Sequence, residues 1–171
     1  MDVGLLLLRV VTGLLLAGHG IQKVSFRLGG EGLAGGIQEF RDDGFRGGVL
    51  TALTAGGGQI VGGLLFVAGA ATPLAAATAI GVMTVATTVK WANGPWAQNN
   101  GYEYPGYLVV TSAVLALTGS GRWSVDRAVT STPWPTWVDV AAIALGLAGG
   151  VFTRLALHRP SRATLLGKAE A

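Results

Sequence analysis

The feature that most constrains this chain is a series of five long apolar segments that carry very few charges. They cover residues 3–24, 49–71, 73–91, 104–118 and 137–157. A helix of about 20 mainly apolar residues crosses the hydrocarbon core of a bilayer, and backbone groups in lipid must bond within the chain. Charged residues make up 12% of the 171 residues, about half of what soluble domains carry. The pattern therefore predicts an all-α, polytopic transmembrane helix bundle.

Two details bear on individual segments. Pro73 suits the first turn of the third helix, where its missing N–H would be unpaired anyway. The fourth segment, 104–118, is the shortest, so it needs tyrosines at the membrane interface or very little tilt to cover the apolar thickness.

Glycines are expected to bring these helices together, because lipid supplies no hydrophobic drive for association and small residues let backbones approach. Gly58 and Gly62 have the small-xxx-small spacing in the second segment. Further glycines favour the same kind of contact: Gly13 and Gly20 in the first segment, Gly81 in the third, and Gly146, Gly149 and Gly150 in the fifth. Tight packing of the bundle accounts for these glycines without any ligand.

The connecting segments suggest a membrane surface rather than a second domain. Leu33, Ile37 and Phe40 recur at helical spacing among charged residues, which predicts a short helix lying on the membrane. With five spans, nine Lys and Arg residues fall on the side of the C-terminus and two on the other side. The positive-inside rule then predicts a cytoplasmic C-terminus and an external N-terminus.

Ionisable residues inside spans are costly and are functional candidates by default. Arg9, His19 and Lys23 lie on one stripe of the first helix. Because successive spans cross the membrane in opposite directions, the ends of the first and third helices and the start of the fourth meet the same membrane surface. Several polar residues lie there, and Gln59 lies deeper, in the second helix. The candidate cluster is His19, Lys23, Gln59, Lys90, Asn93 and Glu103.

Structural explanations compete with functional ones at each position. Lys23 and Lys90 sit near helix ends, where lysines snorkel to the interface, and Glu103 could simply pair with Lys90. His19 could be a satisfied bundle histidine or a group that contacts a ligand or handles protons. Arg9 either snorkels outward or has a buried partner, and Gln59 is expected to form an interhelical hydrogen bond.

The residue inventory narrows the chemistry. The chain has no cysteine, so it has no thiol of its own, and its two histidines lie far apart, which argues against a haem or metal site. A net charge of +3 does not suggest a nucleic-acid partner. No covalently bound cofactor is expected. A quinone between helices would suit the cluster, since histidine, lysine and amide groups can bind carbonyl oxygens.

Several short motifs, in their order and spacing, resemble the DoxX family of small bacterial membrane proteins. They are Leu8-Arg9, Gly18-His-Gly-Ile-Gln-Lys23, Gly29-Gly30, Gly32-Leu-Ala-Gly35, Trp91-Ala-Asn-Gly-Pro-Trp-Ala-Gln-Asn-Asn-Gly-Tyr-Glu-Tyr-Pro105 and Leu117-Thr-Gly-Ser-Gly-Arg-Trp-Ser-Val-Asp126. The resemblance covers about residues 3–130. It implies a four-helix membrane core over residues 1–130, to which residues 131–171 add a fifth transmembrane helix and a basic cytoplasmic tail. It also implies the bacterial cytoplasmic, or inner, membrane.

The resemblance carries a functional expectation and one departure. DoxX-like proteins are associated with membrane redox systems, and DoxD-type relatives with thiosulfate oxidation coupled to quinone reduction. Gln59 stands where the family pattern usually has a glutamate, so a mechanism that needs this carboxylate as a proton acceptor is in doubt.

We therefore expect an accessory or anchoring subunit of a membrane-associated redox or respiratory complex. Its expected partners are the lipid bilayer and other membrane or membrane-attached redox proteins. The alternative is a quinone-interacting subunit of a thiosulfate:quinone-like oxidoreductase, with the polar cluster as its site. A small-solute transporter ranks below both, because the chain has no clear inverted repeat.

Overall fold

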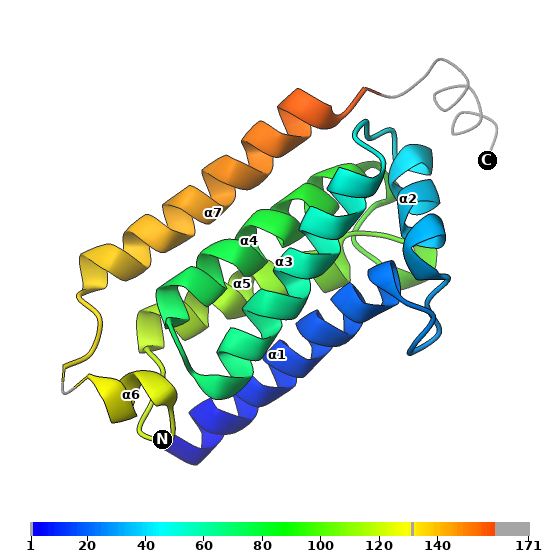
Figure 1. Cartoon of the computed structure of the whole chain (residues 1–171). Helices are drawn as coiled ribbons and strands as arrows, with labels where there is room; N and C mark the ends of the chain where they lie inside the picture. Colours follow the sequence, from blue (N-terminus) through cyan, green and yellow to red (C-terminus); the bar gives the residue numbers. More distant parts are fainter. Residues whose placement is uncertain (1, 131, 160–171) are drawn as a thin grey trace.

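The computed structural model describes residues 2–130 and 132–159, and within these the chain forms a bundle of helices (Figure 1). The long helices are α1 (Asp2–Val24), α3 (Val49–Ala68), α4 (Thr72–Val89), α5 (Glu103–Thr118) and α7 (Thr136–Leu157). The short ones are α2 (Gly32–Asp42), α6 (Val125–Val129) and the 3-10 turns η1 (Lys90–Asn93) and η2 (Ala97–Asn99). The all-α bundle is confirmed, whereas the predicted basic tail beyond residue 159 lies outside the described residues.

Four helices in the described part are long and apolar enough to cross a membrane: Asp2–Val24, Val49–Ala68, Thr72–Asn93 and Thr136–Leu157. Helix α5 has 16 residues and is therefore about 24 Å long, less than the apolar core of about 30 Å. It still starts at the end of the bundle where α4 finishes and stops beside α6 at the opposite end (Figure 1). The chain thus runs the length of the bundle five times.

The two ends of the bundle differ. We call one the Lys23 end, where α1 and α7 finish and where α2, η1 and η2 lie. The other is the Asp126 end, where α1 begins, α3 turns into α4, and α6 lies (Figure 1). Helix α2, which contains the expected apolar spacing, packs across α1 and α3 at the Lys23 end.

Glycine pairs bring α1 and α3 into direct backbone contact. A Cβ on Gly13 would collide with the backbone of Gly63, and one on Gly20 with the backbone of Gly56. The two pairs are seven residues apart on both helices, which is two turns. By contrast, a Cβ on Gly58 or Gly62 would make ordinary contacts of 3.4 Å or more, mostly with α4. The closest approach therefore uses other glycines than this predicted pair.

Helix α7 packs on α4 and α5, so the fifth long helix belongs to the bundle. Gly146 and Gly150 lie against α4, where a Cβ would meet the carbonyl oxygens of Ala77 and Gly81. At the Lys23 end, a short antiparallel bridge between Phe45 and His158 ties α7 to the loop after α2.

Arg9 has a buried partner, one of the two alternatives that the sequence left open. Its side chain is 2% exposed. The guanidinium donates hydrogen bonds to the carbonyl oxygens of Ser120 and, at 2.6 Å, of Trp123. Gly69 ends α3 with a left-handed φ of 64°, and a Cβ there would collide with Arg9. Because a left-handed residue cannot continue a right-handed helix, α3 ends at Ala68, before the end of the apolar segment at residue 71.

Asp126 caps the start of α4 from α6. Its carboxylate accepts hydrogen bonds from the backbone N–H of Ala71 at 2.6 Å and of Thr72 at 3.0 Å, and from the Thr72 hydroxyl at 2.7 Å. Burial alone would raise the pKa of Asp126, but the bonds from Thr72, Ala71 and Trp134 together outweigh burial and lower it. The ionised form is therefore the one that holds α4 to α6.

We expect Asp126→Asn to lower the stability of the detergent-solubilised protein by about 1 kcal/mol at pH 7, the usual loss for a helix cap. A carboxyl whose pKa is lower when folded stabilises the protein above its unfolded pKa, about 4, and this contribution disappears as the pH falls through the folded pKa. The difference in stability between wild type and variant should therefore decrease from pH 7 to pH 3. Thermal unfolding at several pH values measures it.

Asp42→Asn is the matched control, because Asp42 is exposed and its Oδ1 accepts a bond from Gln38 on the same helix. An Asp126→Asn variant that matches wild type at pH 7, or a gap that widens toward pH 3, would contradict the capping role.

Candidate functional site

A cavity of about 750 Å³ lies toward the Lys23 end, between α1, α3, α4, α5 and α7. Its polar and ionisable lining includes His19, Lys23, Glu39, Asp43, Gln59, Lys90, Asn100 and Tyr104, together with threonines. The rest of the wall is mostly aliphatic side chains and glycines. This combination of a roomy apolar wall and a few converging polar groups is typical of small-molecule sites, which span about 300–1,000 Å³.

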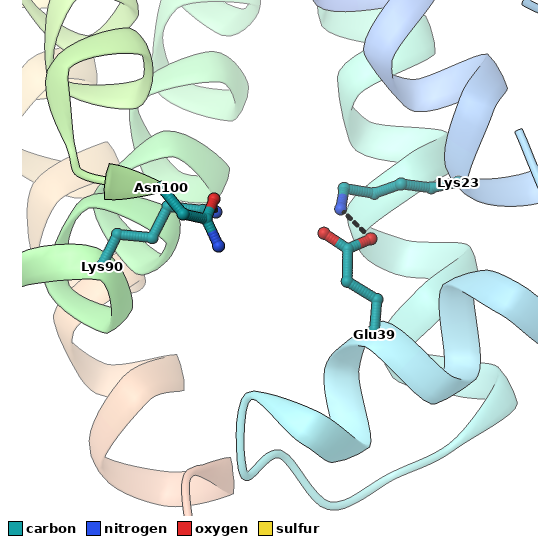
Figure 2. A network of polar contacts seen from close by, with 4 residues as sticks. All are labelled: Lys23, Glu39, Lys90 and Asn100. Carbon is teal, nitrogen blue, oxygen red and sulfur yellow. Dashed lines mark hydrogen bonds and ion pairs between the residues drawn. The ribbon is translucent and has the colours of Figure 1, made fainter. Parts of the chain in front are cut away.

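Two polar pairs face each other across the cavity at the Lys23 end (Figure 2). On one side, Lys23 of α1 donates to Glu39 of α2 at 2.6 Å, and its ammonium lies 5.2 Å from the centre of the Phe40 ring. On the other side, Lys90 donates to the side-chain oxygen of Asn100 at 2.5 Å. The side chain of Lys23 is only 12% exposed, so this lysine is bound within the protein.

His19 lies between two cavities. Its ring centre is 5.5 Å from that of Tyr104, which comes from α5. A second, smaller cavity of about 320 Å³ lies under the loop before α2 and is lined largely by polar residues and glycines. His19, Lys23 and Glu39 line both cavities. These three residues therefore lie where the larger, mostly apolar cavity meets the smaller, polar one.

Gln59 is the deepest polar group of the site. It is 1% exposed, lines the larger cavity, and its Oε1 has no hydrogen-bond partner among residues 2–130 and 132–159. The interhelical hydrogen bond expected for this oxygen is thus not found there. A buried acceptor without a partner costs about 1–3 kcal/mol. Gln59 lines the cavity, but Oε1 itself is closed off from the cavity space, so a ligand would reach this oxygen only after the side chain rotates.

Asn93 and Glu103 lie at the same end of the bundle but hold the loop between α4 and α5. Asn93 donates to the carbonyl oxygen of Asn100 at 3.1 Å, and Glu103 accepts from the backbone N–H of Ala97 at 3.0 Å. The ion pair between Glu103 and Lys90 is not found among the described residues. Of the six predicted residues, the structure thus brings His19, Lys23, Gln59 and Lys90 together in one cavity.

The sequence reading missed Glu39, Asn100 and Tyr104 as lining residues. Glu39 lies next to Phe40 on the amphipathic helix that the sequence places on the membrane surface. The structure instead packs this helix across α1 and α3, which brings Glu39 to the cavity. Asn100 and Tyr104 had no readable signal, since their directions depend on the two 3-10 turns and on a left-handed Asn100 with φ of 55°. The contribution of α7 to the cavity was also missed.

Chemically, the site offers hydrogen-bond donors on both sides of an apolar chamber. The ammonium groups of Lys23 and Lys90 and the ring of His19 can donate, while Gln59 offers both a donor and an acceptor. The Tyr104 hydroxyl already donates to the carbonyl oxygen of Leu15 at 3.5 Å. Within the described residues, no group of three or more His, Cys, Asp or Glu is arranged to hold a metal ion.

The sequence of the chain is similar to that of known proteins. The family model described as DoxX matches residues 4–91, which include α1, α2, α3 and α4. A protein of Bacillus subtilis (strain 168) described as "Putative oxidoreductase CatD" is 35% identical over 132 residues, covering 73% of this chain and 86% of that protein. No solved structure matches the chain.

Proposed function

Because the chain belongs to the DoxX family of membrane proteins, we propose that it is a subunit of a membrane redox system and that it binds a quinone in its cavity. The observation that carries this proposal is the unpaired, buried Oε1 of Gln59 in the wall of a largely apolar cavity. The relative's description as an oxidoreductase supports the redox context.

The donors and acceptors of the cavity suit both redox forms of a quinone. The oxidised ring only accepts hydrogen bonds, through its two carbonyl oxygens, and His19 and the amide N–H of Gln59 can supply them. The reduced ring carries hydroxyl groups, which also donate. Once the Gln59 side chain rotates toward the cavity, its unpaired Oε1 can accept from such a hydroxyl. A glutamine therefore serves both states without a change of charge.

Reduction of a quinone to a quinol consumes two electrons and two protons. The chain has no cysteine, so we propose that a partner redox protein supplies the electrons and that this chain anchors it to the membrane. The chain itself binds and orients the ring. The smaller, polar cavity that His19, Lys23 and Glu39 also line would supply the protons.

We expect Gln59→Leu to weaken binding of menadione, a quinone without a side chain, by about tenfold, which corresponds to about 1.4 kcal/mol. The same variant should be as stable as wild type without ligand, or more so, because it removes a buried unpaired acceptor. Quenching of tryptophan fluorescence in lipid nanodiscs measures the affinity, and thermal unfolding measures the stability.

Gln38→Leu is the control, since Gln38 is exposed on α2 and outside the cavity lining. If wild type does not bind menadione, or if Gln59→Leu binds it as tightly as wild type, the quinone site is wrong. Loss of stability in Gln59→Leu would instead indicate a structural amide.

The anchoring role predicts a stable association with a redox protein. Purification of the full chain from its native membrane in a mild detergent, followed by mass spectrometry, should recover a protein that carries a flavin, a metal centre or redox-active cysteines. Recovery of this chain alone in several mild detergents would count against the anchoring role while leaving the quinone site open to its own test.

We also propose that the Lys23 end faces the cytoplasm, because Lys and Arg residues gather there. Because the chain has no cysteine, a single introduced cysteine is the one site that a maleimide can label. A membrane-impermeant maleimide should label Ala128→Cys at the Asp126 end of intact cells, whereas Gln38→Cys should react only after permeabilisation. Both positions are exposed, so the opposite pattern would reverse the orientation.

A further inference from the structure

The cavity extends well beyond the polar pairs at the Lys23 end. Its lining runs from Ala77 on α4 to Lys90 at the start of η1, and on α7 from Leu145 to Leu157. At 1.5 Å per residue these stretches cover about 18–20 Å, which is more than half of the bilayer's apolar thickness of about 30 Å. The polar pairs occupy only the Lys23 end of this length.

The longer part of the cavity is an apolar groove between α3 and α7, with α4 as its floor. Half-buried Thr78, Val82 and Val85 of α4 form the floor. Exposed residues stand on either side, Thr54 on α3 and Leu145 and Gly149 on α7. The groove therefore opens sideways, at the surface of the bundle that faces lipid.

At the Lys23 end, the loop after α2 closes the groove. Phe45 and Leu157 line the cavity there, and they lie where the loop is bonded to α7. The backbone N–H of Arg46 donates to the carbonyl oxygen of Leu157 at 3.0 Å, and that of Arg159 donates to Gly44 at 2.8 Å. These bonds join the loop to α7 at this end, whereas the side between α3 and α7 carries exposed lining residues.

The glycines of α7 have two different roles. Gly146 and Gly150 press α7 against α4, since a Cβ on either would collide with α4. Gly149 lies between them in sequence and lines the cavity, yet a Cβ there would have nothing within 4 Å. The missing side chain at position 149 thus enlarges the groove instead of tightening a helix contact.

We propose that this groove holds the polyprenyl tail of a long-chain quinone, which enters from the bilayer between α3 and α7 while its ring reaches Gln59 and His19. The inference rests on the observation that the groove and the polar site belong to one cavity. The buried, unpaired Oε1 of Gln59 indicates where the ring would bind. The inference rests on the proposed quinone site and adds the ligand class and a role for α7.

The tail gains little free energy by leaving lipid for an apolar groove, because lipid is as apolar as the groove. What the groove provides is a path that lets the ring reach the polar end while the tail stays in apolar surroundings. An obstruction in the groove should therefore weaken binding of a quinone with a tail and leave a quinone without one unaffected.

The test compares two probes, menadione and the matching menaquinone with four isoprene units, on the full chain in nanodiscs. Gly149→Leu should weaken menaquinone binding at least tenfold and change menadione binding less than twofold. Leu145→Trp, one helical turn away on the same wall, should give the same selective loss. Gly57→Leu is the matched control, because a Cβ on Gly57 also has nothing within 4 Å and Gly57 does not line the cavity.

The outcomes separate the two proposals. Unchanged menaquinone affinity in Gly149→Leu and Leu145→Trp overturns the tail groove, and so does an equal loss of both probes in these variants. Binding of menadione but not menaquinone by wild type overturns it as well. Failure of wild type to bind either probe overturns the quinone site itself.

Discussion

The close contact of α1 with α3 is the interaction on which the arrangement of the site depends. In lipid, helices associate only where their surfaces allow close approach, and the pairs Gly13–Gly63 and Gly20–Gly56 bring the two backbones together. A Cβ on Gly20 would also collide with the Cβ of Gln59. The same contact that packs the bundle therefore sets Gln59 against α1, one residue from His19.

The two ends of the bundle have different tasks. At the Asp126 end, Arg9 and Asp126 fix α1, α4 and α6 through bonds to backbone groups that would otherwise be unpaired. At the Lys23 end, the polar side chains surround a cavity, and Gln59 leaves an acceptor unused. The hydrogen bonds at the Asp126 end stabilise the fold and so offset the cost of an unpaired acceptor at the Lys23 end. Such a balance between stability and binding is common at functional sites.

Much of this fold could be predicted from the sequence, because a membrane span needs a length of apolar chain that is easy to recognise. Four of the five expected segments have a helix that meets the length of a span, and α5 forms within a residue of its expected bounds although it is shorter than a span. The alternating direction of successive spans also predicted that His19, Lys23 and Lys90 lie together, as they do in the structure. It could not tell that Asn93 and Glu103 turn toward the loop, since 3-10 turns and a left-handed Asn100 decide this locally. Nor did it indicate that α7 forms part of the cavity wall, which depends on tertiary packing against α4.

The sideways opening between α3 and α7 has a consequence for what controls occupancy. A molecule that enters by this route is drawn from the lipid phase, so its solubility in water plays no part in how often it arrives. Filling of the site then follows the mole fraction of that molecule among the surrounding lipids, and diffusion within two dimensions sets the rate of encounter. The protein is thereby placed to respond to the composition of its own membrane.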